Sequence, residues 1–219
     1  MKKSILAIAL LSSLSTAALA NQAGDILVRG GVTMVSPDSS KAAVLLDNAD
    51  SGLKVSVDDN AQIGLNFVYF IDQNWAIELL AATPFDHDIK LHAGAATTTL
   101  ADTKHLPPTL SALYYFDTSS SIKPYVGLGI NYTVFFDDSF TGTYSDAGFS
   151  DLKLDNSFGY ALQVGADYDL GDNWSVNVSA RYIDISTDAS FKAGNGTVQG
   201  KASVDIDPMV YSVMLGYTF

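Results

Sequence analysis

The sequence contains no cysteine, few basic residues and little charge of any kind. The absence of cysteine from 219 residues excludes disulfide frameworks, thiolate metal sites and a cysteine nucleophile. Charged residues make up only 16% of the chain, against about 25% in ordinary soluble domains, so a typical cytosolic surface is not expected. Lysine and arginine number 12 against 24 acidic residues, which argues against nucleic-acid binding, because phosphate backbones require clustered basic side chains.

Long apolar runs are also scarce, and the one clear case lies at the N-terminus. Lys2 and Lys3 precede an apolar stretch from Ile5 to Leu11, and Ala18-Leu19-Ala20 has the pattern of a cleavage site. The stretch is shorter than the roughly 20 apolar residues that a membrane-spanning helix needs. Residues 1–20 are therefore predicted to be a signal peptide for export, and residues 21–219 to be the mature chain.

Alternation of apolar and polar residues is abundant in that mature chain. Trp174, Val176 and Val178 alternate with small or polar residues in 174–182, and the same period of two recurs in 158–168 and 209–219. Successive side chains of a strand point to opposite faces, so each segment predicts a strand with one apolar face. Further strands are predicted at 26–35, 61–70, 75–85, 109–116 and 125–136, which makes eight.

Short and long connections alternate between these strands. Turns at 72–74, 117–123 and 169–173 alternate with long polar segments at 36–60, 86–108, 137–156 and 187–207. This pattern is typical of outer-membrane barrels, whose long loops lie outside the cell. The predicted fold is all-β, an eight-stranded antiparallel transmembrane β-barrel that meets lipid and leaves no strand edge unpaired. A soluble sandwich is the alternative, but its strands average about 5 to 6 residues, whereas about 9 to 11 are needed to cross a membrane.

Aromatic residues are expected to form a girdle at each membrane surface. The periplasmic girdle would contain Trp75, Tyr168, Trp174, Tyr217 and Phe219, and the outer girdle Phe85, Tyr132, Phe136 and Tyr182.

Several segments resemble the OmpW family of small outer-membrane channels. They are Ala23 through Arg29, Glu78 through Phe85, His87-Asp88-Ile89, His105 through Thr109, Tyr114-Tyr115-Phe116, Pro124 through Gly129, Asn131-Tyr132-Thr133, Phe135-Phe136 and Asp205 through Pro208. The resemblance implies a barrel that helps small hydrophobic molecules cross the outer membrane. Family members also serve as docking points for phage or bacteriocins, and some relatives import alkanes. The C-terminal Phe219 resembles the aromatic residue by which the outer-membrane assembly machinery recognises its clients.

The interior assigned by alternation is small and partly apolar. An eight-stranded barrel holds side chains or one small ligand, so a general aqueous porin is excluded. Inward glycines, such as Gly31, Gly64, Gly127 and Gly165, indicate that room remains inside. The residues predicted to line a channel are Leu80, Ala82, Pro84, Val68, Phe70, Tyr125, Val210 and Met214. The alternative is that the glycines only relieve crowding and the apolar residues fill the barrel.

Four charged residues are also assigned to the lumen: Arg29, Glu78, Asp167 and Arg181. Arg29 and Glu78 lie at a similar height, so they are expected to pair, because an isolated buried charge is costly. The charges form either a polar floor that blocks passage into the periplasm or a purely structural network.

Prolines suggest a sideways exit from the barrel. Pro84, Pro107, Pro108 and Pro208 fall near the loop-facing strand ends, and each lacks the N–H that a ladder needs. We hypothesise that substrate escapes there into the membrane; otherwise the strands simply end at these residues. Apolar loop residues, among them Val44, Leu100, Phe140 and Leu152, are expected either to capture ligand at the mouth or to pack the loops together.

The sequence predicts no catalytic residue, cofactor or metal site. His87, His92 and His105 are the only histidines, and no hydrolase, metalloprotease or nucleotide-binding motif accompanies them. Two functions remain open. The first is a passive channel for small hydrophobic molecules, and the second is a closed surface barrel. The acidic loops of such a closed barrel would bind a partner, phage or bacteriocin, or lipopolysaccharide, with shared divalent cations as one route.

Overall fold

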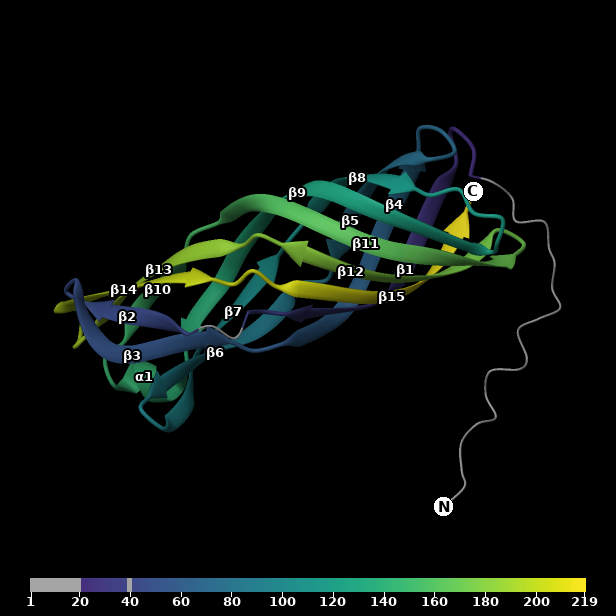
Figure 1. Cartoon of the computed structure of the whole chain (residues 1–219). Coiled ribbons are helices and arrows are strands. Elements are labelled where there is room, and N and C mark those ends of the chain that lie inside the picture. Colours follow the sequence, from purple (N-terminus) through teal and green to yellow (C-terminus); the bar gives the residue numbers. More distant parts are fainter. Residues whose placement is uncertain (1–20, 39–40) are drawn as a thin grey trace, which may run out of the picture.

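Figure 1 shows the computed structural model of the chain, which describes residues 21–38 and 41–219. The predicted signal peptide, residues 1–20, lies outside the described residues. Strands make up nearly all of the described part, and its one helix is the five-residue α1 (Gly142–Asp146). No helix in these residues is long and apolar enough to cross a membrane.

Eight strands close into an antiparallel barrel, as predicted. They are β1 (Ile26–Ser36), β4 (Asn60–Phe70), β5 (Trp75–Ala82), β8 (Thr109–Tyr115), β9 (Ile122–Phe140), β11 (Ser157–Gly171), β12 (Trp174–Ile183) and β15 (Met209–Thr218). Each pairs with the next in this order, and β15 pairs back with β1 over Leu27↔Thr218 to Ser36↔Met209. Closure satisfies the strand edges that lipid cannot hydrogen-bond.

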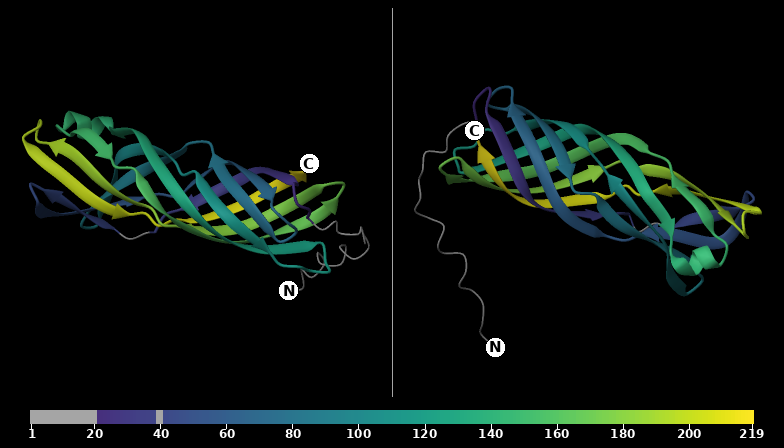
Figure 2. Two further views of the ribbon diagram at one scale, coloured as in Figure 1. Left: turned by 90° about the horizontal axis from the view of Figure 1, so that it is seen from above. Right: turned by 180° about the vertical axis from the view of Figure 1, so that it is seen from behind.

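The four long connections are themselves mostly strand. They contain β2 (Ala42–Leu46), β3 (Ala49–Val57), β6 (Phe85–Ala93), β7 (Ala96–Leu106), β10 (Ser150–Leu154), β13 (Ser186–Ala193) and β14 (Val198–Asp205). These strands pair in the order β9-β7-β6-β3-β2-β14-β13-β10 and continue the wall beyond the barrel. Figures 1 and 2 show this extension at the end of the barrel opposite the C-terminus. The sequence predicted loops here because these segments are rich in polar residues and lack the long apolar faces of the barrel strands.

The outer face of the barrel is apolar and exposed. Side chains such as Ile63, Leu128 and Val213 have 59 to 65% of their surface exposed, as suits contact with lipid. At the end with the short turns, Trp75 packs on Tyr114 with ring centroids 5.0 Å apart, and Trp174 packs on Tyr217 at the same separation. These contacts place aromatic rings at the periplasmic surface.

Phe85 is not part of the outer girdle, and Pro84 does not face the lumen. Phe85 is 1% exposed, whereas Pro84 is exposed, which reverses the sides that unbroken alternation predicts. The reversal arises because β5 ends at Ala82 and β6 begins at Phe85, so the interruption at Thr83 and Pro84 changes which side each later residue faces.

The inward glycines do not leave the space that the sequence suggested. A Cβ atom on Gly165 would lie 2.5 Å from Cζ of Tyr125, and one on Gly127 would lie 2.6 Å from Cδ2 of Leu113. Carbon atoms that are not bonded to each other do not approach so closely. The side chains of neighbouring strands therefore already occupy the space beside these glycines. The expectation of free room at the glycines is wrong, and the glycines there relieve crowding.

Candidate functional site: a polar floor below an apolar cavity

The lumen is crossed by one connected network of buried polar side chains. The guanidinium of Arg29 donates to Oε2 of Glu78 at 3.0 Å and to Oδ2 of Asp167 at 2.5 Å. Arg181 also pairs with Glu78, so the carboxylate bridges both arginines of the chain. The predicted pairing of Arg29 with Glu78 is confirmed, and the four charges assigned to the lumen are all buried and connected.

Uncharged side chains complete this network, which we call the polar floor. Tyr115 accepts from Arg29 at 2.5 Å and donates to Asp167 at 3.1 Å, while Asn177 donates to the other oxygen of Asp167 at 2.9 Å. The remaining members, Asn66, Gln163 and Tyr125, bond to Glu78, Arg181 and Asn177. Seven of the eight barrel strands contribute, so the floor spans the lumen from wall to wall.

The predicted channel-lining residues lie on both sides of this floor and do not form one path. Val68, Phe70 and Tyr125 belong to an apolar cluster with Leu27, Ala76, Leu113 and Tyr115 at the periplasmic end. Val210 and Ala82 belong to a second cluster, which continues into the extension. Leu80 and Met214 are buried in the barrel, and Pro84 is exposed.

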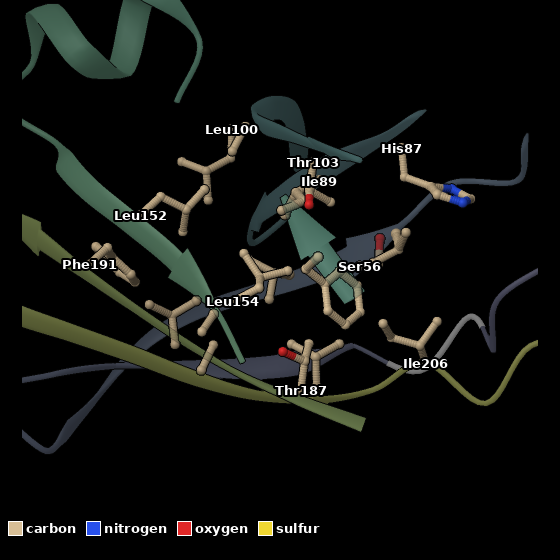
Figure 3. A pocket seen from close by; sticks show the side chains of 18 of the residues that line it. Ser56, His87, Ile89, Leu100, Thr103, Leu152, Leu154, Thr187, Phe191 and Ile206 are labelled. Atoms are coloured by element: carbon tan, nitrogen blue, oxygen red, sulfur yellow. The ribbon is translucent and has the colours of Figure 1, made fainter. Parts of the chain in front are cut away.

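An apolar cavity lies inside the extension. The residues that line it are Val44, Val55, Ser56, Val57, His87, Ile89, Leu100, Ala101, Thr103, His105, Phe135, Phe140, Leu152, Leu154, Thr187, Ala189, Phe191, Ala202, Val204 and Ile206. None of them is among the eight predicted lining residues. Figure 3 shows Leu152 and Phe191 toward one end of the cavity in that view, and His87 and Ile206 toward the other.

The sequence did contain a signal for this cavity. Val44, Leu100, Phe140 and Leu152 stood out as apolar residues within polar segments, and all four line the cavity. Alternation continues in those segments, for example at Ala202, Val204 and Ile206. Such short alternating runs define an inner face only when neighbouring strands are known, and the sequence does not show which strands pair.

Stacked aromatic rings form the barrel-side end of the cavity. The rings of His87 and His105 are 4.9 Å apart and nearly parallel, and Phe85 stacks on His105 at 5.3 Å. Both histidines belong to the extension, above the membrane-spanning strands. Burial lowers the pKa of His87, and burial together with the neighbouring His87 lowers the pKa of His105 to about 3. Both rings are therefore neutral at physiological pH.

The wall is interrupted next to this aromatic stack. Pairing between β5 and β8 ends at Leu80↔Thr109, and pairing between β6 and β7 begins at Phe85↔His105. Residues 81–83 bond to β4 on one side, but no ladder joins residues 81–84 to residues 106–108 on the other. Pro107 and Pro108 have no N–H that could donate to a neighbouring strand. This lack is the feature on which the hypothesis of a sideways exit was based. The interruption lies level with Tyr132, whose N–H donates to the Pro108 carbonyl at 3.1 Å.

Pro208 does not weaken the wall in this way. Its carbonyl accepts from the N–H of Ile183 at 3.2 Å, and the N–H of Ile206 donates to Ile185 at 2.8 Å. Main-chain bonds thus continue across this part of the wall, so the inclusion of Pro208 among the weak points was wrong.

Comparison with known proteins assigns the chain to a family. The sequence pattern of the OmpW family matches residues 22–219. The chain belongs to the OmpW family. It is 45% identical to outer membrane protein W of Vibrio cholerae over all of both chains. The crystal structure of OprG from Pseudomonas aeruginosa is similar, with a TM-score of 0.86 and 42% identity over 91% of this chain and 98% of that one.

A more distant relative is the dibenzothiophene metabolism operon protein PahQ of Pseudomonas aeruginosa. It is 28% identical over 87% of each chain. Together with the closed barrel, membership of the OmpW family places this protein in the outer membrane, with its apolar belt in contact with lipid.

Proposed function

We propose that this OmpW-family barrel passes small hydrophobic molecules from the cell exterior into the outer membrane. The observation that carries the proposal is the position of the apolar cavity, which lies above a closed polar floor and beside an interrupted wall. A hydrophobic molecule gains by entering the apolar cavity. It would lose that gain in the polar floor, where displaced ion pairs leave buried charges without partners.

Lateral exit is the route that this arrangement favours. The interruption between residues 81–84 and 106–108 opens at the level of the outer aromatic ring Tyr132. Phe85 and His105 lie at its extension-side edge, and rearrangement of these rings would connect the cavity with the interruption. A molecule leaving there enters lipid without meeting the floor. PahQ supports the proposal, because its name associates an OmpW relative with the metabolism of an apolar aromatic compound.

The test is the entry rate of a small apolar fluorescent probe into cells. Cells with the wild-type barrel, with no barrel, and with Leu154→Asp at equal surface abundance would be compared. Leu154 lines the cavity, and a carboxylate there removes its apolar character. Ile71→Asp, in an exposed turn residue, is the matched control. Wild type and Ile71→Asp are expected to be faster than the other two.

A closed surface barrel is the second candidate, favoured by the filled lumen at the glycines and the floor. Equal entry rates in all four strains would support it. Acidic residues of the extension would then bind a protein partner, phage, bacteriocin or lipopolysaccharide. In either case we propose a non-enzymatic protein whose C-terminal Phe219, 72% exposed, is recognised by the assembly machinery.

A further inference from the structure

His87 contributes an unused hydrogen-bond acceptor at the cavity. Its Nδ1 atom lies 2.6 Å from the carbonyl oxygen of Asp58. A carbonyl oxygen only accepts, so Nδ1 carries the proton, and the neutral ring leaves Nε2 with a lone pair. Nε2 is buried and has no hydrogen-bond partner within the protein. The side chain of His87 is only 2% exposed to solvent, and it lines the cavity.

We propose that the cavity selects apolar molecules that carry one hydroxyl group, and that this hydroxyl donates to Nε2 of His87. The inference rests on the proposed function, because it specifies which molecules the same cavity prefers. A buried acceptor without a partner costs free energy, which a donating ligand recovers. An otherwise similar ligand without a donor leaves the acceptor unpaired.

Two other polar groups of the cavity wall favour the same ligand. The hydroxyl of Thr103 donates to Oδ1 of Asp138 at 2.6 Å, and the hydroxyl of Thr187 donates to the carbonyl of Asp155 at 2.7 Å. Their protons are therefore used within the protein, and what they can still offer is a lone pair. With His87, these groups form a wall that can accept hydrogen bonds from a ligand.

Carboxylate ligands are disfavoured by the same wall. No lysine or arginine is among the described residues that line the cavity, and a buried carboxylate without a positive charge nearby is strongly disfavoured. His87 and His105 are neutral, because burial lowers the pKa of both rings. Asp138 lies directly behind Thr103 and adds negative charge. An alcohol is thus expected to bind, and the fatty acid of the same length is not.

The shape of the cavity indicates a slender ligand. The centre of a water-sized sphere can reach only about 50 Å³ of it, so the cavity is narrow, and its middle is lined by aliphatic side chains such as Val55, Leu154 and Val204. In Figure 3, His87 lies at the opposite end of the cavity from Phe191. An unbranched alcohol would therefore place its hydroxyl at His87 and its chain toward Phe191.

Nitrogen-15 NMR of histidine-labelled protein in lipid bilayers tests this assignment directly. The chain has three histidines, so their signals can be assigned by single substitution. Addition of 1-octanol is expected to shift the Nε2 signal of His87, because a hydrogen bond to its lone pair forms. Octyl methyl ether and octanoate, at the same concentration in the bilayer, are expected to leave that signal in place.

Equilibrium retention of the three radiolabelled compounds gives the second measurement, with protein-free bilayers subtracted. One hydrogen bond corresponds to about tenfold preference for octanol over the ether. His87→Phe, which keeps a flat ring, should abolish the preference, whereas His92→Phe should retain it. Equal shifts with alcohol and ether, or a preference that survives in His87→Phe, would overturn the inference while leaving the proposed function intact. If neither alcohol nor ether is retained, both fail.

Discussion

The guanidinium of Arg29 lies 3.0 Å from the carboxylate of Glu78, and both side chains are completely buried. The pair joins β1 to β5, strands that are not neighbours in the barrel, because β4 lies between them. Glu78 also forms an ion pair with Arg181 on β12, so one carboxylate connects the three strands β1, β5 and β12 across the lumen. It is the only glutamate of the chain, and no other residue duplicates this function.

Replacement of Glu78 by Gln should destabilise the barrel strongly. The variant leaves Arg29 with Asp167 and removes the carboxylate from Arg181, so a buried positive charge loses its partner. The expected loss is about 3–5 kcal/mol in the free energy of unfolding, measured with urea in liposomes. Asp146→Asn, an exposed change on α1, is the control and should be neutral. Equal stability of the two variants would show that the floor does not hold the barrel together.

Of two adjacent glycines of β1, only one should be sensitive to replacement by alanine. A Cβ on Gly31 would lie 2.6 Å from the main-chain Cα of Met214, whereas one on Gly30 would lie 3.5 Å from Cδ2 of Leu65. Overpacking typically costs about 1–3 kcal/mol, so Gly31→Ala should unfold at lower urea concentration. Gly30→Ala should stay within about 0.5 kcal/mol of wild type. A neutral Gly31→Ala would mean that the lumen has free space after all.

Acid should destabilise the extension through His105. Its pKa is about 3 in the folded protein, because of burial and the adjacent His87, against about 6.5 when unfolded. The unfolded chain therefore binds a proton first as pH falls, and stability is lost between about pH 6.5 and pH 3. His105→Phe should flatten this part of the profile of unfolding midpoint against pH.

Phe135→Leu is the control for that experiment. It disturbs the packing on His105, whose ring lies 5.7 Å from that of Phe135, but it keeps the titrating group. The pH slope should therefore persist in this variant at lower overall stability. A wild-type slope in His105→Phe would show that other groups cause the acid sensitivity.

A cross-link across the interrupted wall should stop transport. Thr83→Cys combined with Leu106→Cys places one thiol on each side of the gap, in a chain without other cysteines. Cross-linking with a short bifunctional thiol reagent that contains a disulfide should abolish entry of the apolar probe. Reduction should restore entry.

The matched control cross-link lies where the wall is continuous. Ser186 and Asp205 are direct partners in the β13–β14 ladder and are both exposed, so Ser186→Cys with Asp205→Cys should cross-link without affecting entry. Undiminished transport in the Thr83–Leu106 cross-linked protein would exclude exit through residues 81–84 and 106–108.

The barrel itself was readable from the sequence because its strands are long and strictly alternating. Residues 174–182 identify an apolar face without reference to any neighbour, since lipid accepts any apolar side chain. The lumen charges followed from the same period of two, and the pairing of Arg29 with Glu78 followed from their similar distance from the turns. These features depend only on local geometry and on the cost of burying a charge.

The cavity and the closed floor depended on tertiary structure, since contacts between residues distant in sequence create them. Phe85 faces inward because the wall is interrupted at Pro84, and alternation alone put it on the opposite side. The space at Gly165 is filled by Tyr125 from another strand, which composition does not reveal. Alternation in the sequence determines which side chains of a strand share a face. Strand pairing determines which side chains of different strands are in contact. These contacts leave a cavity in the extension and close the barrel beneath it.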